Sequence, residues 1–266
     1  QLRDIVVEID NLSENVSGTL QLGTSHHIGL HRLPPALKHF NLQYPQVNLD
    51  IAFSNSESAC AEVQGGHLEL AVITLPSHNT PNLKFKMLWP DPLHIVIAHD
   101  HPCIKKILHA SPTEKLRILK KLPAILPQPG TYTRQIMEDE FKKHNLIFQD
   151  KLATNNLETI KMMVKVGLGW SVLPNTLLDK SLKKISGAKL QISRQLGLVW
   201  HQKRTLSNAA SAMINVLSAC DYENNQRNNN LVNNIANFGG SNNGIYLYSS
   251  SNNNQLLNNK DYERGY

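Results

Sequence analysis

The chain has 266 residues with a formal net charge of +6, long enough to bury a sizeable core in one large domain or two lobes. Its lysines and arginines are scattered and are not interleaved with aromatic residues, so the charge does not indicate a nucleic-acid-binding groove. No apolar run reaches the length of a membrane span, and we therefore expect a globular chain with no membrane contact.

The first sixteen residues carry apolar side chains at spacings of three and four, which predicts an amphipathic helix over residues 1–16. Ser17-Gly18 ends this helix, as glycine commonly does. The first residue is glutamine rather than methionine, and the apolar stripe begins abruptly. We expect the chain to begin inside a larger protein.

A first series of strands and helices follows from Gly18. Polar and apolar residues alternate over 19–22 and 47–53, and residues 68–73 form a nearly continuous apolar run, so three strands are predicted. Helical spacing after residue 27 predicts one helix, and Ser56 is predicted to cap a second that ends at Gly65-Gly66. Alternating strands and helices indicate a parallel α/β sheet.

Small hydroxyl side chains stand where each of these strands ends. Thr24, Ser56 and Thr74 fall at the carboxyl ends of three strands, where ligand sites of open α/β sheets lie. The turn over residues 23–27 also leads into a helix, whose free N–H groups suit a small anion. A polar loop that only caps its own helix is the alternative.

A second series repeats this design from residue 93. Residues 93–98 and 124–126 read as strands, and the polar loop 127–133 leads into an amphipathic helix. Asn155-Asn156 is predicted to cap a helix that stops at Gly167, before a strand over 170–174. A strand over 196–200 and a helix over 207–217 complete the predicted elements. The residues beyond 220 are rich in Asn and lack apolar periodicity, which predicts a disordered tail over 221–266.

Catalytic and metal-binding patterns are weak in this chain. Cys60, Cys103 and Cys220 are odd in number and have no metal-ligand spacing, which fits a reducing cytosol. His26-His27-x-x-x-His31 and His99-Asp100-His101 contain metal-ligand residue types, but no metalloenzyme signature accompanies them. No Ser-His-Asp order, carboxylate pair or phosphate loop is present. We expect no enzyme activity, no metal and no cofactor.

Several segments together resemble the effector-binding domain of LysR-type transcriptional regulators. The resemblance runs from about Gly18 to Cys220 and depends on the order and spacing of its segments. These segments are GTLQLG at 18–23, Leu33-Pro34, Phe40, YPQVNL at 44–49, GHLELAV at 66–72, His101-Pro102, VGLGWSVLP at 166–174 and LSNAA at 206–210.

The resemblance implies a type II periplasmic-binding-protein-like fold, in which two α/β lobes are joined by two crossover strands with a ligand cleft between them. It implies the end of a linker helix over 1–17, a first lobe over 18–92 plus 196–220, and a second lobe over 93–195. Family members carry a winged helix-turn-helix before this linker, and the resemblance implies that this part lies outside the present sequence. DNA contact is therefore expected through that part of the parent protein, in the cytoplasm, as a homodimer or homotetramer.

The function implied is a sensor that binds a small, anionic effector in the cleft and changes the arrangement of the oligomer on DNA. A solute-binding protein of a transport system shares this fold and is the alternative. An imidazole at His26 or His27, where many relatives have a small side chain, would add charge or narrow the pocket. The predicted effector-binding residues are Thr24, Ser25, His26, His27, Ser56, Thr74, Gln128, Thr131, Tyr132 and Thr133.

Overall fold

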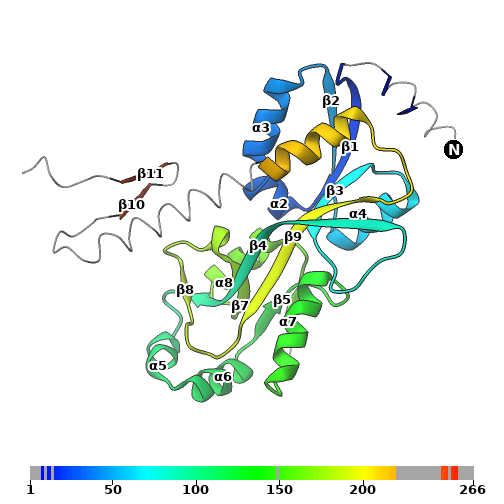
Figure 1. The fold of residues 1–266 in the computed structure, drawn as a ribbon. Coiled ribbons are helices and arrows are strands. Elements are labelled where there is room, and N and C mark those ends of the chain that lie inside the picture. The colour runs from blue at the N-terminus through cyan, green and yellow to red at the C-terminus, as the bar shows by residue number, and fades with distance from the viewer. Residues whose placement is uncertain are drawn as a thin grey trace, which may run out of the picture. The chain divides into compact units, whose positions relative to one another are not determined.

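The computed structural model describes residues 7–8, 11–12, 15–147, 150–219, 247–250 and 253–256. Residues 1–221 form one unit and residues 222–266 a second. Within the first unit, two α/β lobes are joined by two long strands, β4 (Leu83–Ala98) and β9 (Ile192–His201) (Figure 1). These two strands are the crossover strands of a type II periplasmic-binding-protein-like fold.

Lobe I contains the first three strands. They lie in the order β2-β1-β3, with both neighbouring pairs parallel, so their carboxyl ends meet at one edge. The bounds are β1 (Gly18–Thr24), β2 (Val47–Phe53) and β3 (Leu70–Thr74), with helices α2 (His26–His31), α3 (Pro34–Gln43), α4 (Ser56–Gly65) and a helix over 208–219.

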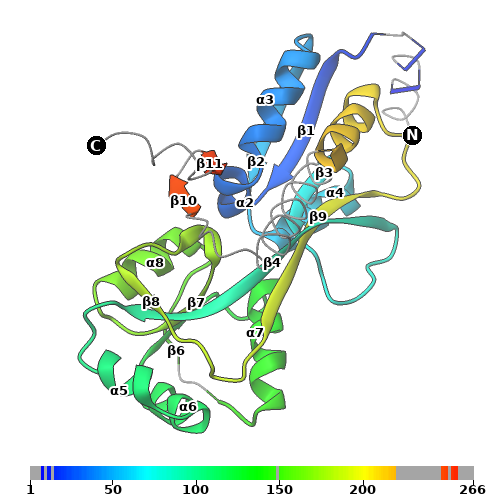
Figure 2. The same ribbon diagram turned by 60° about the vertical axis from the view of Figure 1, so that its left-hand side comes forward.

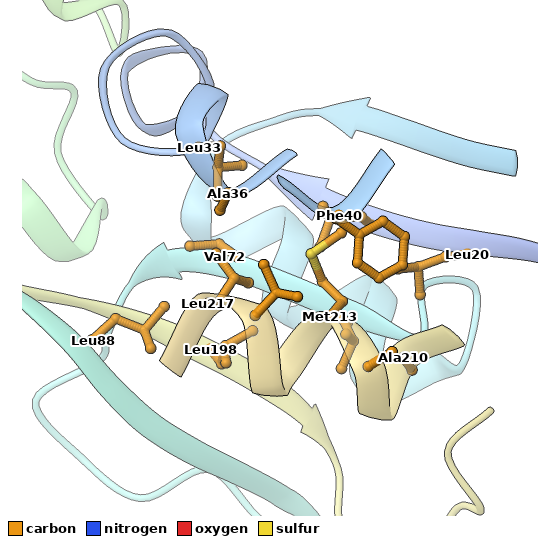
Figure 3. Packing of buried hydrophobic residues seen from close by; sticks show 14 of the residues in the cluster. Leu20, Leu33, Ala36, Phe40, Val72, Leu88, Leu198, Ala210, Met213 and Leu217 are labelled. Atoms are coloured by element: carbon orange, nitrogen blue, oxygen red, sulfur yellow. The ribbon is translucent and has the colours of Figure 1, made fainter. Parts of the chain in front are cut away.

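The core of lobe I combines residues from two segments that are far apart in the sequence. Leu20 of β1 and Phe40 of α3 pack with Met213 and Leu217 of the helix over 208–219, and all four are fully buried (Figure 3). Leu198 of β9 completes this layer. Lobe I is therefore assembled from two separate parts of the chain, and the segment between them forms lobe II.

Lobe II has a core of its own, centred on Trp170. Its indole Nε1–H donates to the carbonyl oxygen of Leu119 at 3.1 Å, and its ring meets Phe141 edge-on. The elements are β5 (Ala124–Leu126), β6 (Asp150–Ala153), β7 (Ser171–Pro174), β8 (Leu182–Lys184), α5 (Ile104–His109), α6 (Pro112–Lys121), α7 (Tyr132–Lys143), α8 (Leu157–Lys165) and the 3-10 helix η1 (Asn175–Leu177).

The two crossover strands form an antiparallel ribbon that runs through both lobes (Figure 2). Leu83 pairs with His201 in lobe I, and Leu93 pairs with Ile192 at the start of lobe II. The strands are packed tightly, because a Cβ at Gly197 would lie 2.3 Å from the backbone oxygen of Lys86. On either side β9 pairs with β3 and β4 pairs with β7, so the sheet continues from one lobe into the other.

The predicted helix ends agree with the structure, and one predicted cap does not. Gly66 follows α4 in the left-handed conformation with φ of 77°, which a glycine adopts without strain. Gly167 has a similar φ of 81° after α8. Ser56, however, does not cap α4: the Asn55 side chain accepts from the backbone N–H of Ser58, because Asn55 is one residue earlier and has the extended backbone of an N-cap.

The chain segments outside the lobes are described only in part. Of the predicted first helix, Val7 and Glu8 are helical, and the other residues before 11 lie outside the described residues. Most of the predicted tail is likewise outside them, except for an antiparallel hairpin of β10 (Leu247–Ser250) and β11 (Asn253–Leu256). Across the described part of the chain, no helix combines the length and apolarity needed to cross a membrane.

Candidate functional site

A cleft of about 430 Å³ lies where the two lobes face each other. Lobe I contributes the segments that follow β1 and β2 and the last residue of β3. Lobe II contributes the loops before α7 and α8 and the first residues of these helices, and β9 contributes one arginine. The lining residues are Ser25, His26, His27, Ser54, Asn55, Ser56, Glu57, Thr74, Pro127, Gln128, Thr131, Thr133, Thr154, Asn155, Asn156, Leu157 and Arg194.

Four helices begin at this cleft, and the N-cap of each lines it. In every case the cap side chain accepts a hydrogen bond from the backbone N–H three residues later. The caps are Ser25 of α2, Asn55 of α4, Thr131 of α7 and Asn156 of α8. Helix N-termini carry partial positive charge, so the walls of the cleft favour a negatively charged group.

Arg194 of β9 lies in the cleft wall and is held by a buried carboxylate. Its Nε donates to Asp91 Oδ2 at 2.7 Å, and Arg32 Nη2 donates to the other oxygen of Asp91 at 2.9 Å. Asp91 and Arg194 are 1% and 4% exposed. Burial would raise the pKa of Asp91, but the charges and hydrogen bonds of the two arginines outweigh it, and the pKa lies below its ordinary value.

The free side of the Arg194 guanidinium faces two of the predicted threonines. Nη1 donates to Thr133 Oγ1 of lobe II at 3.2 Å and lies 3.5 Å from Thr74 Oγ1 of lobe I. Nη2 is buried and has no hydrogen-bond partner. The Arg194 guanidinium therefore lies between hydroxyl groups of both lobes, and its Nη2 can still donate hydrogen bonds.

His27 lies at the border of the cleft and is almost fully buried, at 3% exposed. Its Nε2 lies 3.2 Å from Thr176 Oγ1, and its Nδ1 lies 3.5 Å from Glu158 Oε1, so a lobe I imidazole contacts two side chains of lobe II. Burial and the charge of Arg194 lower the pKa of His27 from 6.5 to about 4. The ring is therefore neutral at pH 7.

Glu57 provides a second contact between the lobes. Its carboxylate accepts a short hydrogen bond from the backbone N–H of Tyr132, the first residue of α7. Because Glu57 belongs to α4, a lobe I anion sits at a lobe II helix N-terminus. This protein carboxylate shows that the N-terminus of α7 accepts a negative group.

Eight of the ten predicted site residues line the cleft together, namely Ser25, His26, His27, Ser56, Thr74, Gln128, Thr131 and Thr133. Some of their side chains already have protein partners. Ser56 Oγ accepts from the Thr74 N–H at 3.0 Å, and the amides of Gln128 and Asn155 bond each other. His26 stacks on Phe53, with ring centroids 5.1 Å apart.

The predictions for Thr24 and Tyr132 are corrected, because neither residue lines the cleft. Thr24 is the last residue of β1, is fully buried, and its hydroxyl donates to the carbonyl oxygen of Val72 at 2.9 Å. Tyr132 lies beside Cys60 of α4, and burial together with this neighbour raises the pKa of its hydroxyl. The Thr24 hydroxyl is therefore used inside lobe I, and the Tyr132 hydroxyl lies beside Cys60.

The chain matches the family model described as the LysR substrate binding domain over residues 13–220. It belongs to this family. Among relatives of the LysR domain, the uncharacterized HTH-type transcriptional regulator YeiE of Escherichia coli K12 is 27% identical over 228 residues, 84% of this chain and 74% of YeiE. The HTH-type transcriptional activator CmpR of Synechocystis is 24% identical, with 83% of this chain and 71% of CmpR covered.

Solved structures share the fold of this LysR domain. The effector-binding domain of QuiR in complex with shikimate superposes with a TM-score of 0.68 and 18% identity, covering 78% of this chain and 98% of that domain. The regulatory domain of Synechocystis PCC6803 CcmR in complex with 2-PG gives 0.66 and 21%, covering 77% and 98%. The family model and the relatives together identify residues 13–220 as the substrate-binding domain of a LysR-type transcriptional regulator.

The predicted site residues omit the charged residues Arg194, Asp91 and Glu57 of this LysR domain site. They also omit five polar residues that line the cleft, namely Ser54, Asn55, Thr154, Asn155 and Asn156. Arg194 occupies a buried position in the alternating pattern of β9, between the apolar Ile192 and Leu196. A charged residue at a strand position that is otherwise apolar indicates an ion pair, because a buried charge requires an oppositely charged partner. Asp91, flanked by two prolines, carries the complementary signal, whereas nothing in the sequence marks the contact of Glu57 with α7.

Proposed function

We propose that the cleft binds a small organic acid through its negatively charged group, as the effector of the regulator. The observation that carries this proposal is the buried Nη2 of Arg194, which has no protein partner in a cleft where α4, α7 and α8 all begin. A carboxylate or phosphate oxygen would accept from this nitrogen and from the polar groups around it. A cationic ligand would leave Nη2 of Arg194 without an acceptor, although Asp91 still pairs with the Nε of the same guanidinium.

The size of the cleft supports a small ligand. At about 430 Å³ it falls near the lower end of the range for small-molecule sites, roughly 300–1,000 Å³. The QuiR and CcmR domains, which share the fold, were solved with shikimate and 2-PG. These complexes support an effector of similar size here, but at 18% and 21% identity they do not specify it.

The regulatory role follows from the position of the cleft. A ligand that contacts both lobes favours the arrangement in which it makes more bonds, and it shifts the lobes only by that difference in affinity. We propose that this shift alters a homodimer or homotetramer bound to DNA in the cytoplasm through another domain of the parent protein. The relatives are transcriptional regulators, which favours sensing over transport or catalysis.

Isothermal titration of the purified chain with small carboxylates, phosphate and sulfate tests the proposal. The control ligand is the neutral amide or alcohol analogue of any acid that binds. The double substitution Ser25→Ala/Thr74→Ala should weaken the acid, because each hydrogen bond to a charged group contributes about 1.5–3 kcal/mol. Thr113→Ala, an exposed threonine on α6, is the matched control.

Two results would contradict the proposal. If the neutral analogue binds as tightly as the acid, the cleft does not recognise charge. If the Ser25→Ala/Thr74→Ala variant keeps the wild-type Kd, the acid binds elsewhere.

A further inference from the structure

Two histidines on α2 and a glutamate on α8 form a cluster at the junction of the lobes, beside the cleft. His27 and His31 are four residues apart on α2, so their rings lie on one face of the helix, with centroids 4.8 Å apart. Glu158 stands in the first turn of α8 and belongs to lobe II. Helices α2 and α8 lie at the ends of the two lobes that face each other (Figures 1 and 2).

The potential ligand atoms of this cluster converge. His31 Nε2 lies 3.1 Å from Glu158 Oε1, His27 Nδ1 lies 3.5 Å from the same oxygen, and one ligand atom from each residue can be chosen within 4.8 Å of the other two. A tetrahedral ion with bonds of about 2.0–2.1 Å places its ligands about 3.3 Å apart. Two of the three separations are therefore already close to those of a metal site.

We propose that His27, His31 and Glu158 bind one divalent transition-metal ion between the two lobes. Two imidazole nitrogens and one carboxylate are the donor set of many Zn²⁺ sites that keep a further coordination position open, and they contain no thiolate that would demand a softer ion. The site goes beyond the effector cleft, and its formation requires no effector.

Unpaired buried atoms in the cluster support the proposal. His27 Nδ1 and Glu158 Oε2 are both buried and have no hydrogen-bond partner. Buried polar atoms rarely lack a hydrogen-bond partner in folded proteins, so an unpaired one requires an explanation. A cation bound to His27 Nδ1 would satisfy this nitrogen, and it would also satisfy Glu158 Oε2 if the carboxylate binds through both oxygens.

The surroundings are also suited to a metal. Thr176 Oγ1 lies 3.2 Å from His27 Nε2, so it can accept from this nitrogen and leave Nδ1 free for the ion, as outer partners of metal-bound histidines do. Asp91 offsets the charge of the nearby Arg194. The His31 and Glu158 side chains are 30% and 31% exposed, which gives the ion a path from solvent and room for water ligands.

Equilibrium binding of Zn²⁺ to the purified chain tests the site, with Co²⁺ as the spectroscopic probe. We expect one ion per chain at micromolar free metal. The ligand-field spectrum of Co²⁺ should show nitrogen and oxygen ligands without the charge-transfer band of a thiolate, which separates this site from the cysteines. Zn²⁺ should also raise the melting temperature, and EDTA should reverse the rise.

Variants of the exposed ligands locate the ion without disturbing the buried core. His31→Ala and Glu158→Gln should each weaken Zn²⁺ binding by at least about 100-fold, and Thr176→Val should weaken it by about 10–100-fold through the orientation of His27. His67→Ala is the matched control, because it removes an exposed histidine that also contacts a glutamate, Glu62, at 3.0 Å. It should leave Zn²⁺ binding unchanged.

Three results would overturn the proposal. They are the absence of Zn²⁺ binding at micromolar free metal, unchanged affinity in both His31→Ala and Glu158→Gln, and a thiolate charge-transfer band with Co²⁺. The effector proposal is tested separately, because His31→Ala and Glu158→Gln alter no residue that lines the cleft.

Discussion

Replacement of Asp91 by alanine should destabilise the domain strongly, because it leaves a buried guanidinium without its counter-charge. Asp91 accepts from Arg194 at 2.7 Å and from Arg32 at 2.9 Å, and Arg194 has only 4% of its side chain exposed. Removal of one partner of such a buried pair costs about 3–5 kcal/mol. For a domain of this size the loss corresponds to a fall in Tm of about 6–20 °C.

Thermal and urea unfolding of the Asp91→Ala chain measure this effect. The control is Glu62→Ala, whose carboxylate pairs with His67 at the surface and should contribute about 0–1 kcal/mol. The double variant Asp91→Leu/Arg194→Met should recover most of the lost stability, since an apolar pair can replace a buried ion pair. It should not recover anion binding, which separates the structural role of the pair from its role in the cleft.

The same carboxylate makes a pH-dependent contribution. Because the folded-state pKa of Asp91 is below the ordinary 3.8, its stabilisation is fully present above pH 4 and is lost as pH falls through the folded-state value. Asp91→Asn should therefore flatten the acid side of the stability curve. A loss below about 1 kcal/mol in Asp91→Ala, or an unchanged acid limb in Asp91→Asn, would show that Asp91 and Arg194 do not form a strongly coupled buried pair.

Three further substitutions test other parts of the structure. Trp170→Phe removes the indole N–H that donates to Leu119 and should lower the free energy of unfolding by about 1–3 kcal/mol in a urea titration. Thr131→Ala removes the N-cap bond to Arg134 and should cost about 1 kcal/mol, with a glycine at the same position costing less. Glu57→Gln removes a negative charge from the cleft. It should tighten acid binding by about 3–10-fold, because roughly 1 kcal/mol of charge repulsion is removed. An unchanged Kd would show that Glu57 does not compete with the ligand.

The sequence was most informative where one local signal is sufficient. The alternation in β2 and the apolar run of β3 identified these strands, and the glycines after α4 and α8 marked the helix ends. Ser56 and Thr74 both line the cleft at one edge of the sheet, because parallel strands bring their carboxyl ends together.

Contacts between segments far apart in the sequence could not be predicted from local sequence patterns. The helices α5 and α6 were not predicted, and the pairing of Asp91 with Arg194 depends on the register of two strands about a hundred residues apart. The prediction for Thr24 was wrong because the last side chain of a strand can face either the cleft or the core. A shift of one residue along the strand changes which of the two it faces. The cluster of His27, His31 and Glu158 likewise depends on how lobe II meets lobe I.

The first described residues are attached to lobe I. Glu8 lies within 3.3 Å of Thr205, and the Asn11 side chain bonds Leu206 and Asn208, so this segment is fastened to lobe I. Under the proposed function, a ligand that shifts lobe II relative to lobe I leaves this attachment to lobe I unchanged. A second molecule bound to lobe I alone would then experience no change, whereas one bound to both lobes would be displaced.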